Sequence, residues 1–464
     1  MLAGPSDLLE ALSFRDGSVV LPSVYGVSDF AAATIGLASL AVAEWEVLRR
    51  EETLGQVGEI GAVEIDRDHA SVAFRSERYL ARPAKAWPSL WDSMAGDYPT
   101  RDGFIRLHTN YPHHRAAAER VLGPGEDRTR IDQVIARLDA AELEREIVAE
   151  GGCAAAMHSA AEWAEHPHGR IISSAPPLTL ARSARQAESR PHRPLPPAPA
   201  GRPLAGIRIL DLTRVIAGPT CTRFLAAWGA EVLRIDPLGF DEGEALLADT
   251  TVGKRCAGLD LKQDEGQKRF EALIAEADAL VVGYRSDALD ALGLTTEVLR
   301  KANPRLVIAA LDAYGFEGPW RARRGFDSLV QMSCGIAARG QAVYGTTMPK
   351  PLPAQALDHG TGYLLAAAVC RGLTETRRND KIVDARLSLA GTAQALMAMG
   401  EIGDPERPEP SDAEVEPFLV REEGHFGQIQ RIACPGRIAG VPPKWTRPAG
   451  PLGLDSPDWA YTLG

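Results

Sequence analysis

RPLAGIRILDLTRVIAGPTCTRFLAAWGAEVLRID, residues 202–236, decides the fold of this protein. Its apolar run IRILDL (207–212) has the length and composition of a buried strand. The run GPTCTRFLAAWGA (218–230) predicts a helix that carries Pro219 in its first turn. EVLRID (231–236) predicts the next strand. A strand, a helix and a second strand in this order predict a βαβ unit with parallel strands.

The same alternation continues for about a hundred residues. The later predicted elements are a helix at 264–277, a strand at 277–283, a helix near 295–304 and a strand at 305–311. This rhythm predicts an α/β fold, with a Rossmann-like open parallel sheet in one domain and a smaller α+β domain beside it. The first turn, TRVIAGPTCT, lacks G-x-G-x-x-G, so a dinucleotide site is not supported. Asp236, at the end of the second strand, is then expected to be a solvated strand-end residue.

A proline-rich segment divides the chain. QAESRPHRPLPPAPAGRP holds few apolar residues and predicts a semi-rigid linker over 186–202. Residues 1–185 then form a first module that includes the smaller domain, and 203–400 form the Rossmann-like domain with a helix around Asp358. Residues 401–464 are a C-terminal tail segment.

Charge and composition exclude several classes of protein. The net charge of -11 repels phosphate-rich polymers, so nucleic acid is not an expected partner. The six cysteines form no C-x-x-C pair and are expected to be reduced and buried. The N-terminus lacks the pattern of a signal peptide, and no stretch is expected to reach the length of a membrane span. These features predict a cytoplasmic protein with no membrane partner.

A faint internal repeat connects the two parts of the chain. SVYGVSDFAAATIGLASLAVAEW around Asp29 is similar to PAQALDHGTGYLLAAAVCRGL around Asp358. A second echo pairs GRIISSAPPL (169–178) with GRIAGVPPKW (436–445). We interpret the first part as a partial, divergent copy of one ancestral unit that lacks the Rossmann half. Asp29 is expected to be structural.

Asp358 is the residue of greatest chemical interest. It stands where an apolar run ends and a helix of small residues begins, so its side chain could cap that helix. Alternatively, the small residues at 359–362 leave the backbone accessible, and the carboxylate could receive an acyl group there. The residues alone leave both interpretations open.

The chain resembles the class III CoA-transferases, also called the CaiB/BaiF family. The segments that carry the resemblance are RPLAGIRILDLTRVIAGPTCTRFLAAWGAEVLRID, GKRCAGLDLK, ADALVVGYRSDALDALGL, NPRLVIAALDAYGFEGPWRARRGFDSLVQMSCG and ALDHGTGYLLAAA. They span 202 to about 375 in the family's order, and parts of residues 98–171 resemble the family's smaller domain.

The resemblance implies a covalent double displacement on acyl-CoA, with a small carboxylic acid as the second substrate. Asp358 falls on the family's nucleophile, and it would be ionised at neutral pH. No metal and no cofactor beyond coenzyme A as substrate is implied. Family members also form interlocked dimers, so a homodimer or a monomer is expected.

The resemblance also implies which residues hold coenzyme A. They are a mixture of apolar and cationic side chains, which suits an adenine ring and three phosphates: Ile216, Leu259, Lys262, Tyr284, Arg285, Arg323 and Arg324.

Two alternative functions stay open. One is an acyl-CoA racemase or isomerase of the same fold, although family racemases carry a His where this chain has Phe326. The other is a CoA-binding protein without catalysis. The acyl donor and acceptor are not fixed by the sequence.

Two histidine clusters could suggest a metal site, but they lack matching cysteines or carboxylates: His108, His113 and His114, and His166 and His168. We expect surface or packing roles for them and no metal site.

Overall fold

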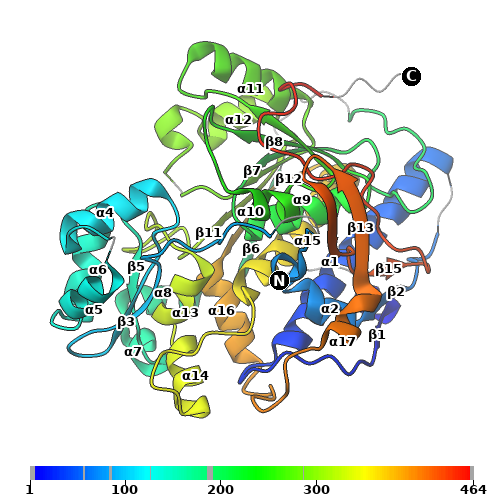
Figure 1. The fold of residues 1–464 in the computed structure, drawn as a ribbon. Helices are drawn as coiled ribbons and strands as arrows, with labels where there is room; N and C mark the ends of the chain where they lie inside the picture. The colour runs from blue at the N-terminus through cyan, green and yellow to red at the C-terminus, as the bar shows by residue number, and fades with distance from the viewer. Residues whose placement is uncertain are drawn as a thin grey trace.

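A computed structural model describes residues 6–55, 58–82, 86–125, 127–184, 192–285 and 287–459. A large sheet flanked by helices makes up most of the molecule, and a smaller α+β unit lies at its side (Figure 1). The predicted α/β class, with a Rossmann-like sheet and a smaller domain, is confirmed.

The seven strands of the large sheet run in the order β6-β12-β11-β10-β7-β8-β9. All neighbours are parallel except β6, which pairs antiparallel with β12. The six parallel strands have the doubly wound order, in which the chain reverses direction between β7 and β10. Ligands of such sheets bind at the carboxyl ends of the strands beside this point. The strands are β6 (Leu178–Ala184), β7 (Arg208–Leu212), β8 (Glu231–Asp236), β9 (Lys254–Gly258), β10 (Ala279–Val282), β11 (Val307–Asp312) and β12 (Lys381–Ser388).

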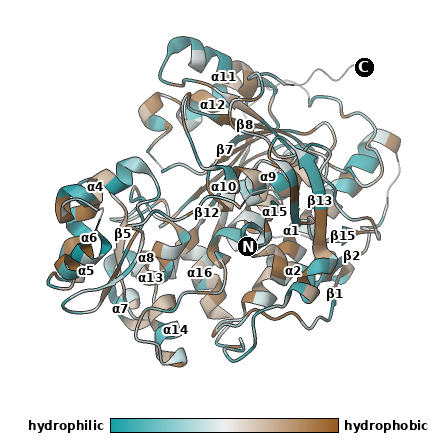
Figure 2. Ribbon diagram, in the orientation of Figure 1, coloured by the Kyte–Doolittle hydropathy of each residue, from teal (hydrophilic) through white to brown (hydrophobic). Residues whose placement is uncertain are grey.

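Alternate strand residues face two separate cores, as the two-residue period of a strand requires. Ile209 and Val232 pack with α1 (Val27–Leu54), α9 (Ala217–Ala227) and α15 (Ala356–Asn379). On the other face, Leu210 and Leu233 pack with α11 (Asp264–Glu276) and α12 (Thr296–Ala302). Figure 2 shows hydrophilic residues on the outer turns of α11, where the helix meets solvent.

Helix α1 is a core helix that packs along α15. Glu44 of α1 and Arg371 of α15 form a buried ion pair between them. By length and composition α1 could cross a membrane, so the expectation that no stretch reaches such a length is wrong. However, 78% of its most apolar window is buried inside the protein, which is the environment of a core helix. The cytoplasmic location stays a prediction.

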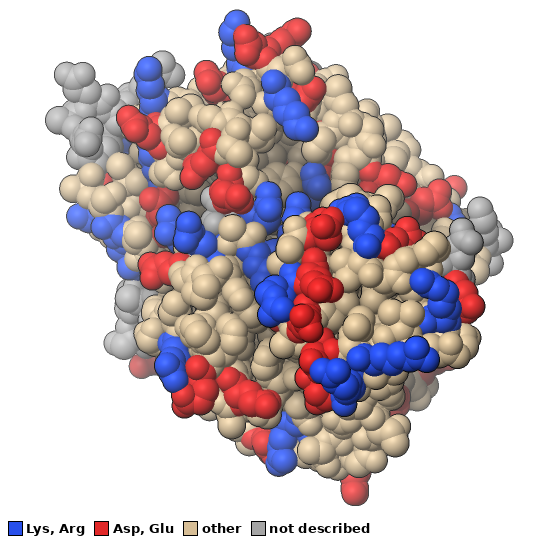
Figure 3. Space-filling model, turned by 90° about the vertical axis from the view of Figure 1, so that its left-hand side faces the viewer, with Lys and Arg blue, Asp and Glu red and all other residues tan. Residues whose placement is uncertain are grey.

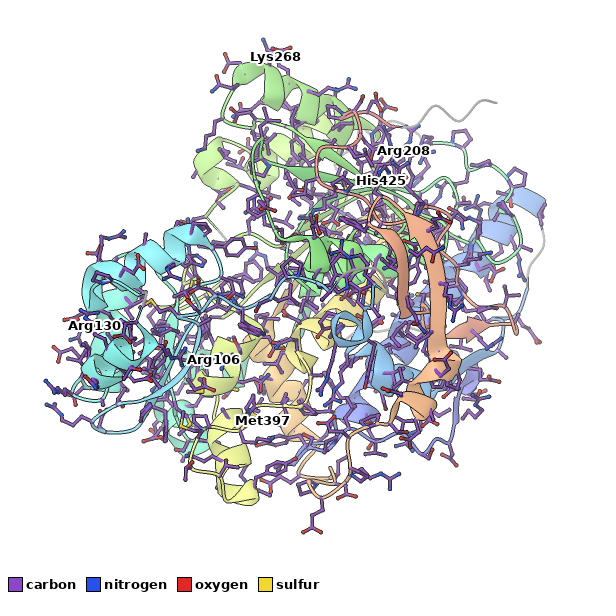
Figure 4. All side chains as sticks on the ribbon, in the orientation of Figure 1. Arg106, Arg130, Arg208, Lys268, Met397 and His425 are labelled. Carbon is purple, nitrogen blue, oxygen red and sulfur yellow. The ribbon has the colours of Figure 1, made fainter. Side chains whose placement is uncertain are left out.

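The smaller unit consists of an antiparallel sheet of order β3-β4-β5, with three helices packed on it. Arg106 of β4, labelled in Figure 4, forms an ion pair with Asp97 of β3 at 2.7 Å. Cys153, beside β5, packs against Leu329 and Met332 of the large domain. The elements of this unit are β3 (Gly96–Pro99), β4 (Phe104–Leu107), β5 (Ala154–Ala156), α4 (Pro112–Leu122), α5 (Arg128–Ile135) and α6 (Ala140–Ala149).

Elements from both sides of the predicted linker share one core. Strand β6 precedes the linker, yet it pairs with β12 from Leu178↔Leu387 to Lys381↔Ala184. Residues 186–191 of the linker lie outside the described residues, and 192–199 have no regular structure. The domain boundaries therefore stay a prediction.

The first echo of the predicted repeat has a common succession of elements. Helix α1, strand β2 (Val63–Asp66) and helix α2 (Arg67–Ala73) follow one another as α15, β12 and α16 (Leu389–Ala398) do. The second echo has no such agreement, because residues 169–171 are helical and 437–438 form strand β15. Descent from one ancestral unit stays a prediction.

The C-terminal segment returns to the first part of the chain. Strand β15 pairs with β2, which pairs with β1. The remaining elements are η1 (Ser6–Ala11), β1 (Leu12–Arg15), α3 (Ser76–Tyr79), α7 (Ala160–Glu165), α8 (Pro167–Ser174), α10 (Glu244–Thr250), η2 (Asp290–Leu292), α13 (Asp327–Ser333), α14 (Ile336–Tyr344), α17 (Asp412–Val415), η3 (Glu416–Phe418), β13 (Leu419–Gly424), β14 (Gly427–Ile432) and β15 (Arg437–Ile438).

A buried ion pair connects the first and third strands of the doubly wound sheet. Lys254 Nζ lies 2.9 Å from Asp211 Oδ2, and both side chains have no exposed surface. Asp211 also accepts hydrogen bonds from the hydroxyl of Thr222 and from the backbone N–H of Thr213. Because Thr213 begins the loop that follows β7, this cluster positions that loop.

We predict that Lys254→Met destabilises the protein by about 3–5 kcal/mol, because the Asp211 carboxylate stays buried without its cation. Chemical denaturation monitored by circular dichroism measures the loss. Asp211→Asn combined with Lys254→Met removes both charges and should recover most of it. If Lys254→Met alone were as stable as the wild type, the buried ion pair would not stabilise the fold.

Candidate active site

Two adjoining cavities lie at the carboxyl ends of the parallel strands, and Asp358 lines both. The arginine cavity has a volume of about 310 Å³ and includes Arg214, Tyr284, Arg285, Asp312, Arg323 and Arg324. The aromatic cavity has a volume of about 690 Å³ and includes Trp91, His108, Tyr111, Ile216, Phe326 and Leu352. Figure 3 shows a hollow in this side of the molecule, with Lys and Arg side chains gathered around it.

Asp358 presents its carboxyl to the cavities because another carboxylate caps its helix. Asp327 accepts hydrogen bonds from the backbone N–H groups of Leu357 and Asp358, at 2.8 and 3.0 Å. Capping by Asp358 itself, one of the two interpretations of the sequence, is therefore wrong. Among the described residues no donor bonds to the Asp358 carboxylate, and its side chain is only 7% exposed.

The environment of Asp358 favours its protonated form. Burial raises its pKa well above the ordinary value, and the negative charges of Asp327 and Glu77 raise it further. Burial also raises the pKa of Asp327, to about 6. The pKa of Asp358 is thus higher than that of the ordinary aspartate on which the expectation of ionisation at neutral pH was based. Once ionised, such a poorly solvated carboxylate is more basic and hence a stronger nucleophile.

The small residues after Asp358 serve packing. A Cβ at Gly360 would lie 2.4 Å from the Phe30 ring of α1, and one at Gly362 would lie 2.5 Å from the carbonyl oxygen of Ala217 in α9. These glycines let three helices approach one another. The interpretation that they keep the backbone open to an acyl group is therefore wrong.

His359 and Glu77 form part of the wall behind Asp358. His359 is fully buried, its Nε2 lies 3.0 Å from Glu77 Oε2, and its ring stacks on Phe74. Glu77 belongs to α3 in the first part of the chain and lines the aromatic cavity. The neighbourhood of Asp358 is thus built from both parts of the sequence.

Four of the residues that the resemblance implied for coenzyme A lie with Asp358 in the arginine cavity: Tyr284, Arg285, Arg323 and Arg324. Ile216 lines the aromatic cavity instead. Leu259 and Lys262 follow the carboxyl end of β9, outside the lining of both cavities. Their position continues the same edge of the sheet.

Arg323 is already engaged by the smaller unit. It pairs with Glu144, donates to the carbonyl of Ala154 at 2.8 Å, and lies 3.9 Å above the Trp320 ring. Arg323 therefore fixes the smaller unit to the large domain, and Arg285 and Arg324 are the better placed of the implied cations to meet an anion in the cavity.

Sequence reasoning missed Arg214. Its guanidinium lies 3.7 Å above the Phe240 ring, donates to the hydroxyl of Tyr284 at 3.3 Å, and lines the arginine cavity. The signal was available, because Arg214 follows the first strand of a doubly wound sheet, where ligands bind.

The turn after Arg214 is strained. Val215 has φ of 66°, which is rare for a β-branched residue. Its backbone N–H donates to Glu242 at 2.7 Å, and Glu242 pairs with the buried Arg234, which also binds Asp236 at 2.8 Å. Asp236 is only 2% exposed, so the expected solvated strand-end role is wrong. This buried chain holds the turn between the two cavities.

The histidines near residue 110 pack against the site. His108 and His114 are buried, as a packing role requires, and the ring of His108 stacks on Phe326 at 3.6 Å. Burial lowers the pKa of both to about 3, so they are neutral. Within the described ranges, no group of His, Cys, Asp and Glu has the arrangement of a metal site. What the sequence did not indicate is that these rings also line the cavities.

One family model matches part of the chain. Residues 204–410 match the model described as CoA-transferase family III. A probable fatty acyl-CoA transferase of Mycobacterium tuberculosis is 30% identical over 240 residues, which cover 47% of this chain and 60% of the relative. A cinnamoyl-CoA:phenyllactate CoA-transferase of Clostridium sporogenes is 32% identical over 196 residues, covering 38% and 47%. A succinate–glutarate CoA-transferase of Agrobacterium fabrum is 29% identical over 265 residues, covering 50% and 65%.

Solved structures give partial matches. A hypothetical protein from Mycobacterium tuberculosis is 30% identical with a TM-score of 0.38, covering 43% of this chain and 57% of that one. A CAIB/BAIF family protein from Brucella suis is 22% identical with a TM-score of 0.39, covering 49% and 65%. The chain spans from 38% to 60% of the length of the first curated relatives that it matches.

We predict that Asp358→Asn raises the melting temperature at pH 7–8. The folded pKa of Asp358 lies above its unfolded value, so folding loses stability as pH rises from the unfolded to the folded pKa. Asparagine has no such loss. The difference in melting temperature between the variant and the wild type should shrink toward pH 4, where Asp358 of the folded wild type is neutral like the asparagine. Differential scanning fluorimetry across this pH range measures the difference. If the melting temperature of the variant relative to the wild type were lower at pH 8 than at pH 4, the pKa of Asp358 would not be raised in the folded protein.

Proposed function

We propose that the chain is a member of CoA-transferase family III, whose model matches residues 204–410, and that it transfers coenzyme A between an acyl-CoA thioester and a carboxylic acid. Asp358 is the proposed covalent nucleophile. The observation that carries the proposal is the place of Asp358 at the junction of an arginine-lined cavity and an aromatic one.

The proposed reaction proceeds by exchange at two carbonyl carbons. An Asp358 oxygen attacks the thioester carbonyl, the carbon–sulfur bond breaks, and the thiolate leaves an acyl-aspartyl anhydride. The thiolate then attacks the aspartyl carbonyl and releases the donor acid, which gives an aspartyl-CoA thioester. The acceptor carboxylate repeats these steps in reverse and leaves as its own CoA thioester. No net proton is consumed.

The charges around the arginine cavity support the binding of coenzyme A there. Arg214, Arg285 and Arg324 can meet the phosphates, and Tyr284 offers an aromatic surface. Leu259 and Lys262 continue this edge beyond the cavity. The acyl group would then occupy the aromatic cavity, on the other side of Asp358.

The alternative of an acyl-CoA racemase is less well supported. Exchange of an α-proton needs an acid–base group near the α-carbon. The position of the family's histidine holds Phe326, and the His108 ring stacked on it has a pKa of about 3, far from neutrality. A CoA-binding protein without catalysis remains the second alternative. A homodimer likewise remains a proposal.

Intact-mass measurement tests the nucleophile. Incubation with an acyl-CoA should add to the wild type the mass of coenzyme A less water, and hydroxylamine should convert the adduct into a hydroxamate at position 358. Asp358→Asn should show no adduct, because an amide is a poor nucleophile, and Asp312→Asn is the matched control in the same cavity. Bound coenzyme A without any adduct would favour the non-catalytic alternative. Solvent deuterium at the α-carbon without an adduct would favour a racemase.

The pH dependence of adduct formation tests the electrostatics. Since only the ionised carboxylate attacks, the rate should fall as pH drops through a raised pKa of Asp358. Asp327→Asn removes a neighbouring negative charge yet keeps a carbonyl oxygen to accept the two backbone N–H groups. In this variant the fall in the rate of adduct formation on the acidic side of the pH profile should move to lower pH. An unchanged profile, measured by rapid-quench mass spectrometry, would show that Asp327 does not act on the nucleophile.

A further inference from the structure

We propose that the aromatic cavity selects a bulky, uncharged monocarboxylic acyl group, with at most a neutral hydrogen-bonding substituent, and rejects dicarboxylic acids. The inference rests on the proposed function and adds the class of acyl group. It follows from the size of the cavity, the pairing of its charges and two polar atoms in its wall.

The walls and volume suit a large hydrophobic group. Trp91, Tyr111, Phe326 and Leu352 contribute aromatic and aliphatic surface from both parts of the chain. The volume of about 690 Å³ lies within the range of about 300–1,000 Å³ that is typical of sites for drug-sized ligands. A four-carbon acid would leave most of this space and its apolar surface unfilled.

The charges in the cavity oppose a second carboxylate. Glu77, Asp327 and Asp358 all line it. Arg75, the buried cation of the wall, is already paired with Glu409 and donates to the carbonyl of Pro353 at 2.7 Å. A second carboxylate deep in the cavity would therefore lie beside other carboxylates without a free partner among the described residues.

The remaining cation, Arg78, lies at the mouth of the cavity. Its side chain is 58% exposed, and Glu409 lies 4.0 Å away. Solvent screens a charge in this position, so Arg78 can contribute little to the recognition of a distal carboxylate.

Two buried polar atoms of the wall lack a partner. Nδ1 of His108 and Oγ of Ser328 form no hydrogen bond among the described residues, and both side chains are more than nine-tenths buried. Unpaired buried polar groups destabilise a protein unless a ligand or water satisfies them. Because His108 is neutral, these atoms suit a hydroxyl or carbonyl of the acyl group and do not neutralise a carboxylate.

The test compares four thioesters by the rate of aspartyl-CoA formation. Butyryl-CoA and succinyl-CoA differ in a terminal methyl or carboxylate, and 3-phenylpropionyl-CoA and 3-(4-hydroxyphenyl)propionyl-CoA differ in one hydroxyl. We expect butyryl-CoA to exceed succinyl-CoA at least tenfold in kcat/KM, and the aryl thioesters to exceed both. Arg78→Ala should leave this order unchanged.

Variants assign the effect to the cavity. Leu352→Trp should lower kcat/KM for the aryl thioesters at least tenfold and leave butyryl-CoA within about threefold, whereas Leu54→Trp, on the exposed end of α1, should change neither. Ser328→Ala should reduce the rate of the hydroxyphenyl thioester relative to its phenyl counterpart, mainly through KM, and His108→Phe provides a second variant.

Each outcome decides the inference. Succinyl-CoA as the fastest donor, above all if Arg78→Ala abolishes its reaction, would overturn the inference and leave the proposed function standing. Equal rates for all four thioesters would do the same. Absence of an adduct with every thioester would overturn the proposed function and the inference together.

Discussion

The hydrogen bonds from the start of α15 to Asp327 are the interaction on which the site depends. A helix begins with backbone N–H groups that need acceptors, and Asp327 supplies one carboxylate oxygen for two of them. Gln331 donates to the same carboxylate and accepts from the backbone N–H of Leu352. One buried cluster thus fixes the helix, the α13 segment and the wall of the aromatic cavity. The negative charge of Asp327 is also one cause of the raised pKa of Asp358, after burial itself.

Helix α15 also packs unusually closely against its two neighbouring helices. The helix runs between α1 and α9, and glycines at 360 and 362 permit contacts that any Cβ would prevent. The buried pair of Glu44 and Arg371 orients α1 against it. The first part of the chain is therefore a structural support of the nucleophile as well as a wall of its cavity.

Much of this architecture was predictable from local patterns. The run of residues 207–311 alternates strands and helices, and this alternation predicts an open parallel sheet, although strand β9 (Lys254–Gly258) is not among the predicted elements. Asp358 stood out because a lone acid precedes a helix of small residues. The pairing of β6 with β12 was not predictable, because it joins segments about 200 residues apart, and periodicity carries no information on such partners.

The errors have a common physical origin. The environment of Asp236, the cap of α15 and the pKa of Asp358 depend on burial and on charges from distant segments, whereas a sequence shows only the neighbours along the chain. The role of His108 and Tyr111 as cavity walls has the same cause. Arg214 is different, since its place after the first strand was visible in the sequence.

The origin of the cavity walls has a consequence for assembly. Tyr111 and Phe326 face the same space, although more than two hundred residues separate them along one polypeptide. The tether between them makes closure of the site an intramolecular event, whose effective concentration is set by the intervening chain. Dilution therefore cannot separate these two walls, in contrast to a site shared between subunits, whose completeness falls once the protein concentration drops below the dissociation constant.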